Sequence, residues 1–164
     1  MPADFVTLLR RDHWDLQQEL TKLLEPTATV AELRASLDGV RLGLVAHAEA
    51  EDIVLSRFDS VPELQVLVAQ ARAAHLAQEG ALSALITARP GTAGWRDRAR
   101  HLRELVAYHA RQEEMFLVAA LAEHAPPEEL RQLAGAFATE RLRQLAMMQP
   151  SAPVFSPFTL AEAV

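Results

Sequence analysis

Hydrophobic residues recur along most of the chain in steps of three or four, which is the spacing of one face of an α-helix. Prolines interrupt this pattern at Pro26, at Pro90 and at Pro126-Pro127, where helices are expected to end or begin. We therefore predict five helices, over residues 3–24, 29–58, 60–89, 92–124 and 127–148. Because the first four are joined by short connections, consecutive helices should run antiparallel.

The predicted fold class is all-α, an up-down-up-down antiparallel four-helix bundle with a shorter fifth C-terminal helix and an extended tail. Residues 1–148 should form the helical domain, with its chemistry in residues 3–124, and residues 149–164 the proline-containing tail. Two helix starts carry a capping-box pattern, Thr29 with Glu32 and Ser60 with Glu63.

A histidine and a glutamate interrupt the apolar stripe of the second predicted helix, at His47 and Glu51. The same pair returns 62 residues later as His109 and Glu113. Upstream, His13 lies as far before His47 as His75 lies before His109. One constant shift thus relates two sets of His…His-x-x-x-Glu, which indicates two copies of a helical hairpin.

Each His-x-x-x-Glu pair places two ligand groups on one helix face, because residues four apart in a helix are neighbours. Burying an unpaired carboxylate costs several kcal/mol, and no Lys or Arg lies on these stripes. A bound cation would remove that cost, so the pattern predicts a metal site.

Four imidazoles and two carboxylates are too many for one tetrahedral ion. They suit two ions bridged by the glutamates, one held by His13 and His47 and the other by His75 and His109. Mixed nitrogen and oxygen ligation favours iron, then manganese, over zinc. The ferritin-like di-iron bundle is a poor alternative, because it uses Glu-x-x-His, an order that occurs at neither hairpin.

Composition and net charge exclude several kinds of metal site and classes of protein. There is no cysteine, which excludes disulfides and thiolate metal sites. A net charge of −6 argues against nucleic-acid binding, and no window resembles a membrane span or a secretory signal. We expect a soluble cytoplasmic protein that binds neither nucleic acid nor membrane.

The segments Arg-Asp-His13, His47-Ala-Glu-Ala-Glu51-Asp, His75 and His109-Ala-Arg-Gln-Glu113-Glu resemble the hemerythrin-like, or HHE cation-binding, domain. The resemblance covers about residues 3–124. It implies a four-helix bundle with a non-haem, usually di-iron, centre. The family's ligand positions match His13, His47, Glu51, His75, His109 and Glu113.

One departure from the oxygen-carrying members concerns the third helix, where they have His-x-x-x-His and this chain has His75-Leu-Ala-Gln-Glu79. Glu79 could be a seventh metal ligand, or it could face solvent. Glu114 competes with Glu113 as the bridging acid. The aromatic residues beside ligands, Trp14 and Tyr108, should pack in the core or at an interface.

The resemblance implies a di-iron protein that binds dioxygen, nitric oxide or a peroxide, for sensing, iron or oxygen handling, or stress protection. Two alternatives stay open. One is a di-iron enzyme that reduces peroxide or nitric oxide, although no separate proton donor stands out. The other is an interaction module with a structural metal, and the fifth helix or the tail could form a homodimer.

Overall fold

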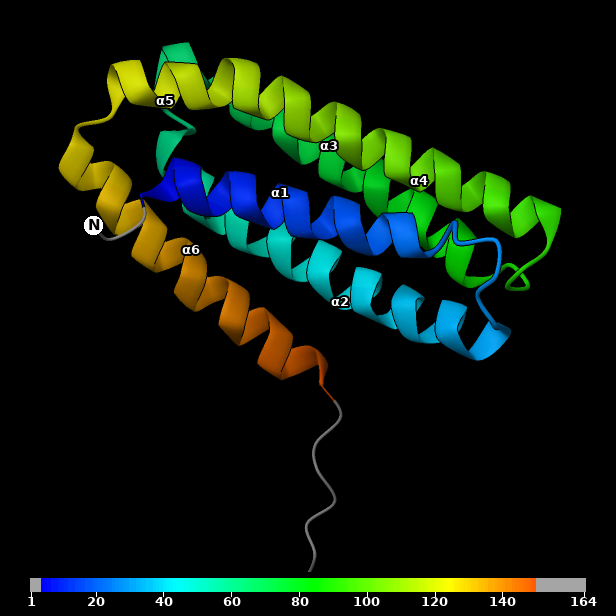
Figure 1. Ribbon diagram of the computed structural model, residues 1–164. Coiled ribbons are helices and arrows are strands. Elements are labelled where there is room, and N and C mark those ends of the chain that lie inside the picture. The colour runs from blue at the N-terminus through cyan, green and yellow to red at the C-terminus, as the bar shows by residue number, and fades with distance from the viewer. Residues whose placement is uncertain (1–3, 150–164) are drawn as a thin grey trace, which may run out of the picture.

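The computed structural model describes residues 4–149, and within them it contains helices and no strands (Figure 1). Four long helices come first: α1 (Phe5–Lys22), α2 (Val30–Leu55), α3 (Pro62–Ile86) and α4 (Ala93–Gln112). Shorter elements continue two of them, and a last helix follows: η1 (Ser56–Phe58), η2 (Glu113–Leu117), α5 (Val118–His124) and α6 (Pro127–Met148). The predicted all-helical fold is confirmed. The predicted tail falls almost entirely outside the described residues.

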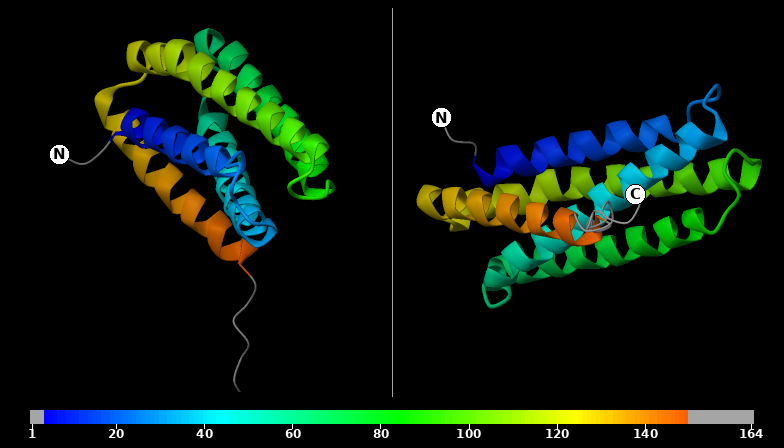
Figure 2. Two further views of the ribbon diagram at one scale, coloured as in Figure 1. Left: turned by 45° about the vertical axis from the view of Figure 1, so that its right-hand side comes forward. Right: turned by 90° about the horizontal axis from the view of Figure 1, so that it is seen from below.

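The four long helices form a bundle in which each packs against two others. α1 packs against α2 and α4, and α3 packs against the same two helices (Figures 1 and 2). α6 lies along the outer side of α2 and α1. With 22 residues, α6 is shorter than α2 (26 residues) and α3 (25 residues), as expected, but longer than α1 (18 residues). No described helix combines the length and hydrophobicity needed to cross a membrane.

Local signals at the helix starts were correct at one site and wrong at another. At α2 the capping box is present, with the Thr29 hydroxyl accepting from the Glu32 N–H and the Glu32 carboxylate accepting from the Thr29 N–H. At α3 the predicted Ser60–Glu63 box does not form, and Val61 is the N-cap. A residue before proline is pushed into extended backbone, so the helix can begin only at Pro62.

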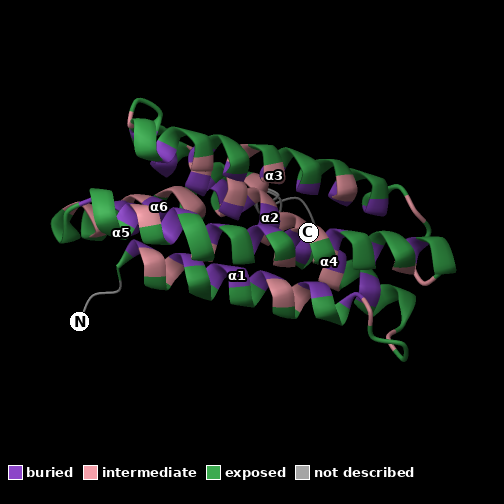
Figure 3. Ribbon diagram, turned by 90° about the horizontal axis from the view of Figure 1, so that it is seen from above, coloured by how far each residue is buried: buried purple, intermediate pink, exposed green. Residues whose placement is uncertain are grey.

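Buried apolar side chains form two clusters, one on each side of the layer that contains the four predicted histidine ligands. The first, called here the Phe58 cluster, includes Phe5, Leu9, Val54, Phe58, Leu64, Leu121 and Phe137. The second, the Trp95 cluster, includes Leu16, Leu20, Leu44, Leu82, Trp95 and Leu102. On α1, His13 lies between Leu9 of the one and Leu16 of the other. Exposed residues follow the outer helix faces (Figure 3). The histidines therefore lie between two apolar regions of the core.

The helix predicted over residues 92–124 is interrupted by a π-helical turn. In η2 the Val118 N–H donates to the Glu113 carbonyl, five residues earlier, in place of the usual four. The turn takes in one extra residue and begins at a predicted ligand. Such π-turns inside α-helices are frequent at functional sites.

Candidate metal centre

All six predicted ligand residues meet inside the bundle. α1 provides His13, α2 provides His47 and Glu51, and α3 provides His75. The fourth long helix provides His109 near its end and Glu113 at the first position of η2. Ligand atoms of five of them lie within 4.8 Å of one another, and all five are buried. The sixth, His75, has its Nε2 only 3.1 Å from the Nε2 of His109.

Each glutamate contacts one histidine of each predicted pair. The Glu51 carboxylate has Oε2 at 3.3 Å from His47 Nε2 and Oε1 at 3.8 Å from His75 Nε2. Glu113 Oε2 lies 3.1 Å from His13 Nε2 and 3.5 Å from His109 Nε2. Each carboxylate thus lies between the two histidine pairs.

The donor atoms of this cluster fit a cation better than they fit one another. His13 Nε2, His47 Nε2 and all four carboxylate oxygens of Glu51 and Glu113 are buried without a hydrogen-bond partner of good geometry. Among the described residues, no Lys or Arg forms an ion pair with either glutamate. Buried polar atoms of this kind are destabilising unless paired, and nitrogen and carboxylate oxygen are suitable ligands for transition metals.

Burial sets the protonation of two imidazoles and of one acid, whereas at His13 burial is outweighed by the Glu113 and Glu114 carboxylates, which raise its pKa. Burial lowers the pKa of His47 and lowers that of His109 to about 3, so both rings are neutral near pH 7. Burial and the nearby Glu113 carboxylate raise the pKa of Glu51. A neutral imidazole offers a nitrogen lone pair, which is the form that binds a metal.

In three of the four histidines, Nδ1 contacts a carboxylate on the side of the ring that faces away from the cluster. The pairs are His47 with Asp12, His75 with Asp52 and His13 with Glu114, each at 2.9 Å. Such a contact fixes the ring so that Nε2 points into the cluster, a common arrangement around metal-binding histidines.

Glu114 therefore lies behind His13, whereas Glu113 lies between the histidine pairs. Asp52 and Glu114 are related by the same 62-residue shift as the ligands, so the repeat contained a signal for both supporting acids. No sequence signal pointed to Arg141 of α6, which contacts Asp12 Oδ1 at 2.6 Å.

Residues beside the ligands take positions that spacing alone left open. Glu79 lies on the exposed face of α3, and its neighbour Gln78 is buried instead, with neither side-chain polar atom hydrogen-bonded. Trp14 and Tyr108 are 61% and 59% exposed, so neither packs in the core, and packing at an interface stays a prediction.

The residue pattern and this geometry agree with a comparison of the whole sequence with family models. Residues 4–121 match the hemerythrin HHE cation binding domain, which is more than half of the chain. No significant match to a curated protein or to a solved structure exists. The chain thus belongs to the hemerythrin HHE cation-binding family, with a buried His/Glu cluster suited to a metal.

Proposed function

We propose that the cluster binds two iron ions, one between His13 and His47 and one between His75 and His109, bridged by Glu51 and Glu113. The observation that carries this proposal is that each glutamate contacts one histidine of each pair. We propose iron in preference to manganese or zinc, which also bind imidazole or carboxylate ligands.

The protein's own contribution is to hold six ligand groups in place between two apolar clusters. Asp12, Asp52 and Glu114 orient three imidazoles, and the Phe58 and Trp95 clusters close the layer from both sides. Iron held there supplies redox chemistry and binding of a small ligand, for which we propose dioxygen, nitric oxide or a peroxide. The role would be sensing, iron or oxygen handling, or stress protection.

Metal analysis of matched variants tests the site. We expect two iron ions per chain after expression with ample iron, and loss of most of that iron in Glu51→Gln, which keeps the side-chain volume but removes the buried charge. The control Glu79→Gln makes the same change on the exposed face of α3 and should keep both ions. One zinc and no iron in the unchanged protein would contradict the proposal, as would full iron content in Glu51→Gln.

The visible spectrum separates a ligand-binding centre from a structural metal. Iron-loaded protein reduced under nitrogen should change its absorption when air or nitric oxide is admitted, because iron responds to its ligands and oxidation state. An unchanged spectrum under both gases would favour the structural metal over the ligand-binding role.

A further inference from the structure

The two halves of the repeat differ at one supporting residue. The 62-residue shift that relates Asp52 to Glu114 relates Asp12 to Ala74. Asp12 contacts Nδ1 of His47. His109 is the equivalent histidine in the second half of the repeat, and none of the hydrogen bonds between described residues involves its Nδ1. An alanine stands where the repeat would place a carboxylate.

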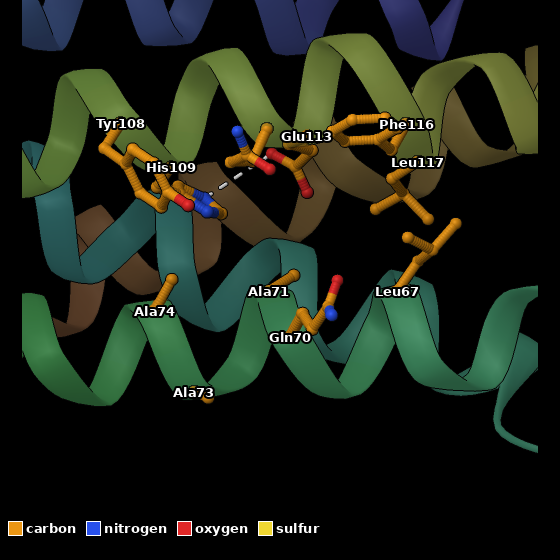
Figure 4. A pocket seen from close by; sticks show the side chains of 11 residues that line it. Leu67, Gln70, Ala71, Ala73, Ala74, Tyr108, His109, Glu113, Phe116 and Leu117 are labelled. Atoms are coloured by element: carbon orange, nitrogen blue, oxygen red, sulfur yellow. Dashed lines mark ion pairs between the residues drawn. The ribbon is translucent and has the colours of Figure 1, made fainter.

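A pocket of about 310 Å³ lies where that carboxylate is missing. α3 lines it with Ala71 and Ala74, and the opposite wall comes from α4 and η2, with His109 and Glu113 at its inner end (Figure 4). The carboxylate of Glu113 reaches towards His109 with one oxygen and directs the other into the space between the helices (Figure 4). Oε1 of this side chain is buried and has no hydrogen-bond partner.

The outer part of the pocket is open and partly aromatic. Tyr108 is 59% exposed and Phe116 48% exposed, and both line it (Figure 4). Large exposed aromatic side chains beside a cavity are a common feature of binding sites. The pocket therefore connects the surface of the bundle with two predicted metal ligands.

The lining groups select for an uncharged ligand with one polar end. No Lys or Arg lines the pocket, and its side walls are apolar apart from the neutral groups of Gln70, Gln112 and Tyr108. An organic anion would find no cationic side chain there. A hydroxyl group at the inner end could donate to Glu113 Oε1, because the contacts of Glu113 with His13 and His109 are both made by Oε2.

The size of the pocket points beyond a diatomic ligand. One water occupies about 30 Å³ in the liquid, so dioxygen or nitric oxide would fill only a small fraction of this space. A volume of about 310 Å³ falls at the lower end of the range for small organic ligands.

We propose that this pocket binds a small neutral organic molecule with an apolar body and a terminal hydroxyl or hydroperoxide group, whose oxygen faces His109 and Glu113. The inference deepens the proposed function, on which it rests for the metal ions beside that oxygen. It extends the ligands of the centre from diatomic molecules and a small peroxide to alcohols or organic hydroperoxides with an apolar body.

Tyr108 offers a direct test because it is the only tyrosine of the chain. Protein carrying a ¹³C-labelled tyrosine ring and loaded with diamagnetic zinc is titrated separately with tert-butanol and with tert-butyl hydroperoxide, and the Tyr108 signal is followed by NMR. We expect a saturable shift, and the tighter of the two probes identifies the terminal group. Absence of a saturable shift with both probes would overturn the proposal.

Matched variants locate the binding. Ala74→Leu fills the pocket and should weaken binding at least about tenfold. Ala77→Leu makes the same change on an exposed site of α3 outside the pocket and should leave the affinity unchanged. Equal affinity in Ala74→Leu and unchanged protein would overturn the assignment.

A second variant tests the pocket without filling it. Phe116→Ala enlarges the partly exposed wall, so it should favour 2-phenyl-2-propanol over tert-butanol compared with unchanged protein. An unchanged preference would contradict the proposal. Zinc content is measured on every sample. A chain that takes up neither zinc nor iron contradicts the proposed function, whereas a zinc-loaded chain whose Tyr108 signal does not shift contradicts only the pocket.

Discussion

The carboxylates behind the imidazoles show how single residues shape this centre. Asp12 is 6% exposed, touches His47 Nδ1 and contacts Arg141 at its other oxygen. Burial alone would raise its pKa, but the contacts with His47 and Arg141 lower it, so Asp12 is ionised at neutral pH. A charged acceptor at Nδ1 makes the opposite ring nitrogen a better metal ligand.

Asp12→Asn should therefore weaken metal binding, by roughly 10–100-fold, because an amide is a poorer acceptor for the His47 ring. Competition with a chelator of known affinity measures the change. Asp15→Asn, one turn away on the exposed face of α1, is the control and should bind metal normally. Equal affinities for both variants would show that Asp12 does not support the centre.

Asp4 provides the pH-dependent prediction. It caps α1 by accepting from the Thr7 N–H at 2.8 Å, and this hydrogen bond lowers its pKa in the folded state. A group with a lowered folded-state pKa stabilises the fold above its ordinary pKa, and that stabilisation is lost as the pH falls through the lowered value. Asp4→Ala should cost about 1 kcal/mol at pH 7, and the difference should shrink below about pH 4. Urea unfolding of both proteins at several pH values measures it; a difference independent of pH would contradict the charge effect.

At the scale of elements, α2 contributes residues to both apolar clusters and carries two of the predicted ligands, His47 and Glu51. Leu44 is 3% exposed in the Trp95 cluster, about one turn from His47. Leu44→Ala should lower the free energy of unfolding by roughly 2–5 kcal/mol through the cavity it leaves, with the ligands still in place. Ile53→Ala, at a 45% exposed site on the same helix, should change it by less than about 0.5 kcal/mol. Similar losses in the two variants, measured by chemical denaturation, would refute this view of the core.

The whole bundle is organised around buried polar groups, so its stability should depend on metal. Without a cation, the unpaired Glu51 and Glu113 oxygens and the histidine nitrogens cost free energy in a dry interior. A ligand that binds only the folded state adds about 4.1 kcal/mol at a concentration a thousand times its Kd. Removing metal with a chelator should lower the melting temperature clearly, and Glu51→Gln should respond little to the same chelator. Equal melting temperatures with and without chelator would mean that folding does not depend on the site.

α6 links the outside of the bundle to this centre. It lies beyond residues 4–121, which match the family, yet its Arg141 contacts Asp12 and its Phe137 ring lies 6.2 Å from that of His47. Phe137 also packs edge-on against Phe5 of α1. The last helix thus supports His47, directly through Phe137 and through Asp12 by way of Arg141, with no counterpart at His109 among the described contacts.

The sequence by itself determined the helices and the six residues that meet. Helical periodicity forces residues four apart onto one face, so the repeated His-x-x-x-Glu pairs had to point the same way as the apolar stripes. Thr29 likewise signalled its helix start, because a capping box involves only neighbours in the chain.

Tertiary structure decided what spacing leaves open. Gln78 and Glu79 are both compatible with the inner face of α3, and the packing of that helix buries only Gln78. The π-turn after Gln112 has no signature in a run of good helix formers. The contact of Arg141 and the pocket beside Ala74 join segments far apart in sequence. Local patterns fix which face of a helix is apolar, but rotation, register and neighbours are set by the packing of the whole chain.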